Sequence, residues 1–125
     1  MLLDTAAMIT LYTYAKCDTC RKAVAHLRQR KAAFTEIPIR EQPPTLAELK
    51  RMLAAHDGEV KKLFNRSGQD YRALGLAEKL PEMSDAEALK LLAANGNLVK
   101  RPFAFIGRHG VVGYDREQWD EALVP

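Results

Sequence analysis

The sequence contains little cysteine, few aromatic residues and no long apolar run, and each shortage excludes a class of protein. Two cysteines in 125 residues are too few for a small secreted domain held together by disulfides. No apolar segment approaches the roughly 20 residues that cross a bilayer, and the N-terminus lacks the basic and apolar regions of a secretory signal. We therefore expect a cytoplasmic protein that does not bind membranes and whose thiols start reduced.

Histidine and excess charge are also scarce. The three histidines, His26, His56 and His109, have no cysteine or histidine partner at the spacing of a metal site, so we expect no metal. The formal net charge is only +3, and basic residues alternate with acidic ones along the chain. This distribution is unlike the concentrated basic surface of a protein that binds nucleic acid directly, and it supports only a weak preference for anionic ligands.

What the sequence does contain is a Cys-x-x-Cys motif, Cys17 to Cys20, between a β-prone segment at 9–13 and a helical pattern. If the helix begins just after Cys17, this thiol lies where unpaired N–H groups and the helix dipole favour a thiolate. Cys20 lies one turn further on the same face, within reach of a disulfide. Lys16 and Arg21 flank the pair and add positive charge. The motif predicts a redox pair in which Cys17 attacks and Cys20 resolves.

Three other interpretations of the two cysteines stay open. They could be inert core residues, although the basic flanks would then have no explanation. A structural zinc site would need two further ligands. A static disulfide would be unusual in a chain without a secretory signal. Redox chemistry accounts for both the spacing and the flanking charges.

The first third of the chain predicts a parallel β-α-β unit. Residues 1–7 precede the first periodic segment, and we expect this N-terminal extension to be disordered. A helix to about residue 30 leads into an alternating segment at 33–39, and this short crossover favours parallel pairing with the strand at 9–13. His26 on the helix is expected to be solvated or half-buried.

The remainder of the chain predicts a helical insertion followed by a return to strands. Capping-box patterns at Thr45 and Ser84 begin amphipathic segments, so we expect the insertion at about 45–97. A β-hairpin pattern at 103–114 follows, and a last helix ends the chain. Residues 8–125 therefore read as a single α/β domain.

Three blocks of the sequence carry a family resemblance. They are Tyr12–Ala23 with both cysteines, Leu63–Leu76, and Leu98–Tyr114 with Trp119 beyond it. In this order and spacing they resemble the arsenate reductase (ArsC)/Spx family over nearly the whole chain from Met8. The resemblance implies a thioredoxin-like fold, with a mixed sheet of about four strands and a helical insertion.

The resemblance also implies roles for matching positions. Cys17 occupies the position of the family's nucleophilic cysteine. Arg101 matches the arginine that binds the oxyanion in the reductases and senses the cysteine state in Spx. Pro102 matches the proline that is cis in thioredoxin-like folds. The expected catalytic residues are Cys17, Cys20 and Arg101, and the expected substrate-binding residues are Arg21, Asn65, Arg66 and Pro102.

The sequence departs from the family pattern at three positions. The arsenate reductases place arginines at the positions of Asn65 and Tyr114, so the anion pocket is depleted here unless Arg66 turns inward. Cys20 is the third departure, because reductases coupled to glutathione and glutaredoxin typically have no cysteine there, whereas Spx proteins often carry Cys-x-x-Cys. A resolving thiol in the same turn makes an internal disulfide competitive with glutathione capture.

These features favour a thiol-disulfide oxidoreductase that reduces arsenate or a glutathione mixed disulfide. It would take a small anionic or thiol substrate, hold no bound cofactor, and be restored by glutathione, glutaredoxin or thioredoxin. The alternative is an Spx-like regulator, in which the redox state of Cys17 and Cys20 controls contact with the RNA polymerase α-subunit. A fold relic without redox function is the third hypothesis. We expect a monomer.

Overall fold

The computed structural model describes residues 8–124, which are divided between two compact units. Of these residues, 8–38 and 101–124 form the sheet unit, and Ile39–Lys100 forms the helical unit. The disordered extension expected at 1–7 lies outside the described residues.

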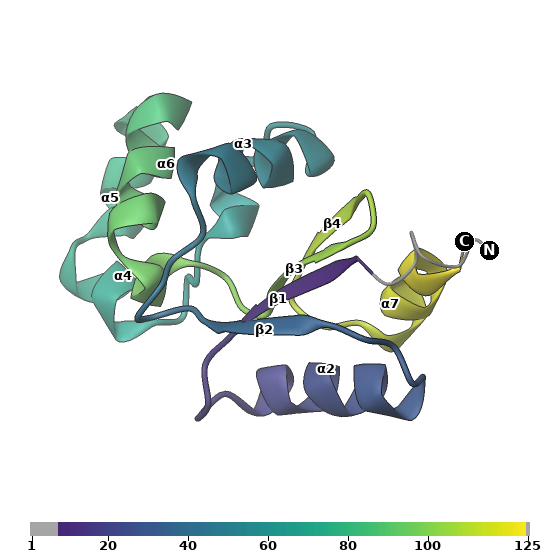
Figure 1. Ribbon diagram of the computed structural model, residues 1–125. Coiled ribbons are helices and arrows are strands. Elements are labelled where there is room, and N and C mark those ends of the chain that lie inside the picture. The colour runs from purple at the N-terminus through teal and green to yellow at the C-terminus, as the bar shows by residue number, and fades with distance from the viewer. Residues whose placement is uncertain (1–7, 125) are drawn as a thin grey trace. The chain divides into compact units, whose positions relative to one another are not determined.

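The sheet unit is built on four strands in the order β2-β1-β3-β4 (Figure 1). The central strand β1 (Ile9–Thr13) pairs in parallel with β2 (Thr35–Pro38) and antiparallel with β3 (Phe103–Ile106), and β4 (His109–Val112) pairs antiparallel with β3. Parallel pairing of β1 and β2 requires a crossover connection, which α2 (Asp18–Gln29) supplies. This mixed sheet with its helices confirms the α/β fold class expected from the sequence.

One face of the sheet is covered by α2 and by α7 (Arg116–Leu123), which lie on the same side of it in Figure 1. Because side chains alternate along a strand, Leu11 of β1 and Ile106 of β3 point to this face, where they join Leu27 and Trp119 in one buried cluster. Burying several large side chains together contributes most of the stability of such a layer. The cluster therefore anchors α2, and with it the two cysteines, against the sheet.

The edge strand β2 is shorter than the alternating pattern at 33–39 predicts, and it ends at Pro38. Proline has no backbone N–H and so cannot donate a ladder hydrogen bond. At the end of an edge strand this missing donor is tolerated.

The helical unit consists of short helices. Its two longest, α3 (Leu46–Ala55) and α6 (Asp85–Ala94), begin with complete capping boxes at Thr45 and Ser84, as predicted. The other segments are η1 (Val60–Leu63), α4 (Gln69–Ala73), α5 (Leu76–Lys79), η2 (Leu80–Glu82) and η3 (Gly96–Leu98). In the part of the chain that the structure describes, no helix combines the length and the apolar character needed to span a bilayer.

Candidate active site

Cys17 is the N-cap residue of α2, as the motif predicts. Its sulfur accepts a hydrogen bond from the Cys20 backbone N–H at 3.3 Å, so it occupies the place that a serine or aspartate oxygen often takes at a helix start. The Cys17 backbone N–H donates to the Tyr14 carbonyl at 3.0 Å and closes the turn from β1. Cys17 is half-buried and its thiol is free. This thiol is therefore held at the positive end of the helix, where a substrate can reach it.

Cys20 lies inside the first turn of α2 and is only 2% exposed. Burial, followed by a hydrogen bond with the Cys17 side chain, raises the pKa of Cys20 to about 12. A backbone hydrogen bond with Tyr14 and the charge of Arg101 act in the opposite direction and are outweighed. Cys20 therefore keeps its proton at neutral pH, and the partly exposed Cys17 is the sulfur that a substrate can reach.

The raised pKa of Cys20 predicts a loss of stability in alkaline solution. Between pH 9.0, the ordinary pKa, and about 12, the unfolded chain releases this proton while the folded chain retains it. The stabilising contribution is complete below the lower value and is lost as the pH rises through the upper one. From about pH 8 to about pH 10.5, the reduced protein should lose about 2 kcal/mol more free energy of unfolding than Cys20→Ala, measured in urea. An equal pH dependence of the two proteins would contradict this account of Cys20.

Arg101 and Pro102 precede β3, and the peptide bond between them is cis, as expected. The guanidinium carbon of Arg101 lies 5.0 Å from the centre of the Tyr14 ring, a cation–π contact. The Nη1 atom of Arg101 is buried and has no hydrogen-bond partner among residues 8–124. A buried guanidinium nitrogen of this kind is a donor that a bound anion or a thiolate can satisfy.

The other charges beside the thiols contribute less than the sequence alone suggests. Lys16 is exposed, and the exposed Arg21 forms an ion pair with Asp18 in the same turn of α2. Solvent screens both cations, and Asp18 offsets part of the charge of Arg21. The half-buried Arg101 is the cation whose charge lowers the pKa of Cys20.

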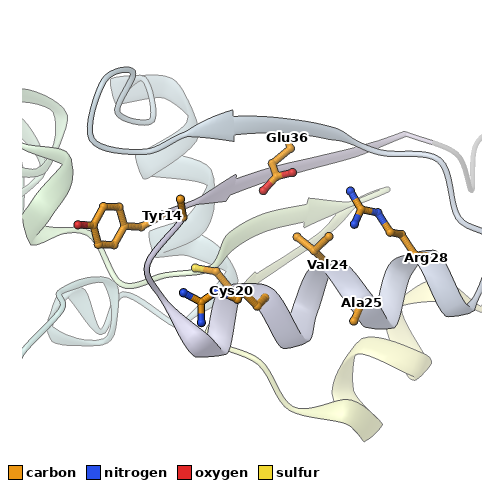
Figure 2. Close-up of a pocket in the computed structure, with 8 residues that line it drawn as sticks. Tyr14, Cys20, Val24, Ala25, Arg28 and Glu36 are labelled. Atoms are coloured by element: carbon orange, nitrogen blue, oxygen red, sulfur yellow. The ribbon is translucent and has the colours of Figure 1, made fainter.

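A cleft of about 380 Å³ opens beside Cys20, between α2 and β2 (Figure 2). Its lining includes Cys20, Val24 and the charged residues Arg21, Arg28 and Glu36. Arg21 thus borders a space large enough for a small ligand. Within residues 8–124, no group of three or more histidine, cysteine or acidic side chains could hold a metal ion.

Asn65 and Arg66 lie in the helical unit, shortly after η1. The Asn65 amide nitrogen donates to the Asn97 carbonyl at 3.5 Å, and its backbone N–H donates to the Leu98 carbonyl at 2.7 Å. Asn65 thus links η1 to η3 within its own unit, whereas the side chain of Arg66 is exposed. A contribution of either residue to substrate binding stays a prediction.

Tyr114, the other position at which the reductases carry an arginine, belongs to a network that sequence reasoning missed. Its hydroxyl lies 2.8 Å from Nδ1 of His26, and Nε2 of His26 lies 2.9 Å from Oδ1 of Asp120, which also accepts a hydrogen bond from Arg30.

The expectation of a solvated or half-buried His26 is wrong, because only 4% of the residue is exposed. Its spacing of three residues from the buried Ala23 is the signal for an inward position. Tyr114 therefore helps to join α2 to the C-terminal segment.

Comparison with known proteins gives this geometry a context. The model of the ArsC family matches residues 12–122. The uncharacterized protein YusI of Bacillus subtilis is 45% identical over 90% of this chain and 96% of its own length. The regulatory protein MgsR of the same species is 29% identical over 86% of this chain and 83% of its own length.

Solved structures agree with the sequence matches. A Bacteroides fragilis protein described as related to the ArsC family has a TM-score of 0.87 and 38% identity, and the match covers 94% of this chain and 98% of that one. The arsenate reductase from Vibrio cholerae has a TM-score of 0.81 and 25% identity, over 94% and 98% of the two chains. The thioredoxin-like fold of the present protein, together with the family match over residues 12–122, shows that this chain belongs to the ArsC family.

Proposed function

We propose that this protein is a thiol-disulfide oxidoreductase in which Cys17 is the nucleophile and Cys20 the resolving thiol. The observation that carries the proposal is the difference between the two thiols. The Cys17 sulfur caps α2 and is partly exposed, whereas Cys20 is buried and keeps its proton. One sulfur can therefore attack a substrate, and the second, one turn away, can displace the product.

In the proposed reaction, the Cys17 thiolate attacks an electrophilic sulfur or arsenic centre and forms a covalent adduct. If the substrate is arsenate, one arsenate oxygen takes up protons and leaves as water, and arsenite departs with two electrons when Cys20 attacks the Cys17 sulfur. If the substrate is a mixed disulfide, Cys17 bonds to one sulfur and the other leaves as a thiol. Cys20 then loses its proton, attacks the Cys17 sulfur and releases the bound fragment, which leaves a Cys17–Cys20 disulfide. The dithiol has given two electrons to the substrate, and glutathione, glutaredoxin or thioredoxin restores it.

Arg101 is the residue we assign to the anionic part of the substrate. Its stacking on Tyr14 limits the motion of the guanidinium, and its buried Nη1 has a hydrogen bond left to donate. A fixed guanidinium can stabilise an oxyanion and the Cys17 thiolate alike. Pro102 and Arg21 are proposed to shape the binding site beside it.

The test is turnover coupled to NADPH oxidation by thioredoxin and thioredoxin reductase, measured above the rate without this protein. Arsenate or a glutathione mixed disulfide serves as the anionic substrate, and 2-hydroxyethyl disulfide, which stays neutral because no free glutathione is added, as the neutral one. Arg101→Gln should lower kcat/KM for the anionic substrate by about 100-fold and affect the neutral one far less. Arg108→Gln, an exposed arginine between β3 and β4, is the charge-matched control. Absence of turnover with every substrate by the wild-type protein would contradict the proposal.

A second candidate function is an Spx-like regulator. It is favoured by the similarity to the regulatory protein MgsR and by Tyr114, whose hydroxyl meets His26 where the reductases carry an arginine. In this case the redox state of Cys17 and Cys20 would control contact with the RNA polymerase α-subunit. A pull-down of that subunit by either the reduced or the oxidised protein alone, together with no turnover, would favour the regulator.

A further inference from the structure

We propose that the cleft between α2 and β2 binds the thiol that reduces the Cys17–Cys20 disulfide, and that Arg28 and Glu36 recognise an α-amino-acid group on this thiol. The inference rests on the proposed function and names the class of its second substrate. That class is a peptide-sized thiol with an ammonium and a carboxylate at its free end.

Arg28 offers an unpaired cation at the cleft. Two other arginines of this region already have acidic partners. Arg21 pairs with Asp18, and Arg30, the residue after the end of α2, pairs with Asp120. Across residues 8–124, by contrast, no carboxylate lies within ion-pair distance of Arg28. Its guanidinium is therefore available to a ligand carboxylate.

Glu36 offers a carboxylate that is already oriented. The buried Thr13 hydroxyl donates to Oε2 of Glu36 at 2.6 Å, which fixes the acid on β2. Figure 2 shows the Glu36 carboxylate directed toward α2 and the Arg28 guanidinium directed from α2 toward the strands, with Val24 on the helix below them. The two charges do not form an ion pair, so a group that carries both an ammonium and a carboxylate complements them.

The position of Cys20 sets the size of the ligand. Cys20 lines the cleft and Cys17 does not. Arg28 follows Cys20 by eight residues, about 12 Å along a helix, and its side chain leans back toward the helix N-terminus. A thiol whose sulfur meets Cys20 must therefore extend further than free cysteine to reach Arg28 and Glu36. The volume of about 380 Å³ suits a small peptide.

The reaction that follows starts from the Cys17–Cys20 disulfide. The ligand thiolate attacks the Cys20 sulfur, the disulfide bond breaks, and Cys17 leaves as a thiolate at the helix N-terminus. A second ligand thiolate attacks the ligand sulfur of the new mixed disulfide and releases Cys20, which takes up a proton. Two thiols become one disulfide, and the protein disulfide gains two electrons. Attack on Cys17 would instead expel Cys20, the poorer leaving group because its pKa is raised.

The test compares how fast glutathione and 2-mercaptoethanol reduce the oxidised protein at equal thiolate concentration. The ratio of the two rates should fall about tenfold in Arg28→Gln and in Glu36→Gln. It should be unchanged in Lys22→Gln, which removes a charge from the same helix outside the cleft. If only the overall charge mattered, Glu36→Gln should instead raise the ratio of the glutathione rate to the 2-mercaptoethanol rate, because removing an acid would speed attack by anionic glutathione.

A second measurement locates the attack. Cleavage after Lys16 and Arg21 releases one peptide with both cysteines, and fragmentation of the acid-quenched mixed disulfide identifies the sulfur that carries glutathione. In the first turnover, before oxidised glutathione accumulates, glutathione on Cys20 supports the proposal and glutathione on Cys17 overturns it. Equal rate ratios in all variants would also overturn it and leave the proposed function intact. If neither thiol reduces the wild-type protein, or no Cys17–Cys20 disulfide forms, it is the proposed function that fails.

Discussion

Replacing Cys17 with serine should lower turnover at least about a thousandfold while the protein stays folded. A serine hydroxyl is not a nucleophile at neutral pH without a base to activate it, so the covalent step is lost. Serine is also one of the best N-cap residues, and its oxygen can accept the Cys20 N–H that the Cys17 sulfur accepts now. NADPH-coupled turnover measures the first effect, and thermal unfolding followed by circular dichroism measures the second.

The matched control is Cys20→Ala, which keeps the attacking sulfur and removes the resolving one. We expect this variant to capture glutathione as a stable mixed disulfide on Cys17, detected by intact mass, and to turn over only as fast as external thiol releases it. Alkylation by iodoacetamide should modify Cys17 well before the buried Cys20 in the wild-type protein. Retained turnover in Cys17→Ser with loss in Cys20→Ala would reverse the assigned roles.

The largest effect on stability is expected from Gly96→Ala, at the start of η3. A Cβ atom at this position would lie 1.9 Å from the carbonyl oxygen of Ile39 and 2.8 Å from its carbonyl carbon. Both contacts are with backbone of the same helical unit, so no flexible side chain can move aside. We expect the substitution to lower the free energy of unfolding by about 3 kcal/mol, measured in urea.

Gly58→Ala serves as the comparison for this prediction. An added Cβ at Gly58 meets no atom within 4 Å, and the position has a φ of +78°. Only backbone strain opposes this change, at a cost of about 1 kcal/mol. If Gly96→Ala were no more destabilising than Gly58→Ala, the result would contradict the close packing of Gly96 against the Ile39 backbone.

Features of the fold that depend on neighbouring residues could be predicted from the sequence. The capping boxes at Thr45 and Ser84 form as predicted, because each hydrogen bond joins residues three apart. Asp115 caps α7 for the same reason. The continuously apolar, β-prone run at 9–13 likewise indicates a strand buried on both faces, and it forms β1 at the centre of the sheet.

Features that depend on packing between distant segments could not be predicted. His26 has an ordinary helical environment in the sequence, and its burial follows from Tyr114 and Asp120, which come from the far end of the chain. The cleft beside Cys20 arises in the same way, because Arg28 and Glu36 belong to a helix and a strand that the sheet brings face to face. Helical spacing from Ala23 marks His26 as inward but does not identify the residues that bury it, and no local pattern marks the cleft.

By itself, the sequence determined that a thiol stands at a helix start with a second thiol one turn later, because capping and helical spacing are local properties. The tertiary structure alone decided that Cys20 holds its proton, that Arg101 lies against Tyr14, and that a charged cleft opens at the resolving sulfur. These outcomes depend on burial and on contacts between segments far apart in the chain, which only the packed fold creates.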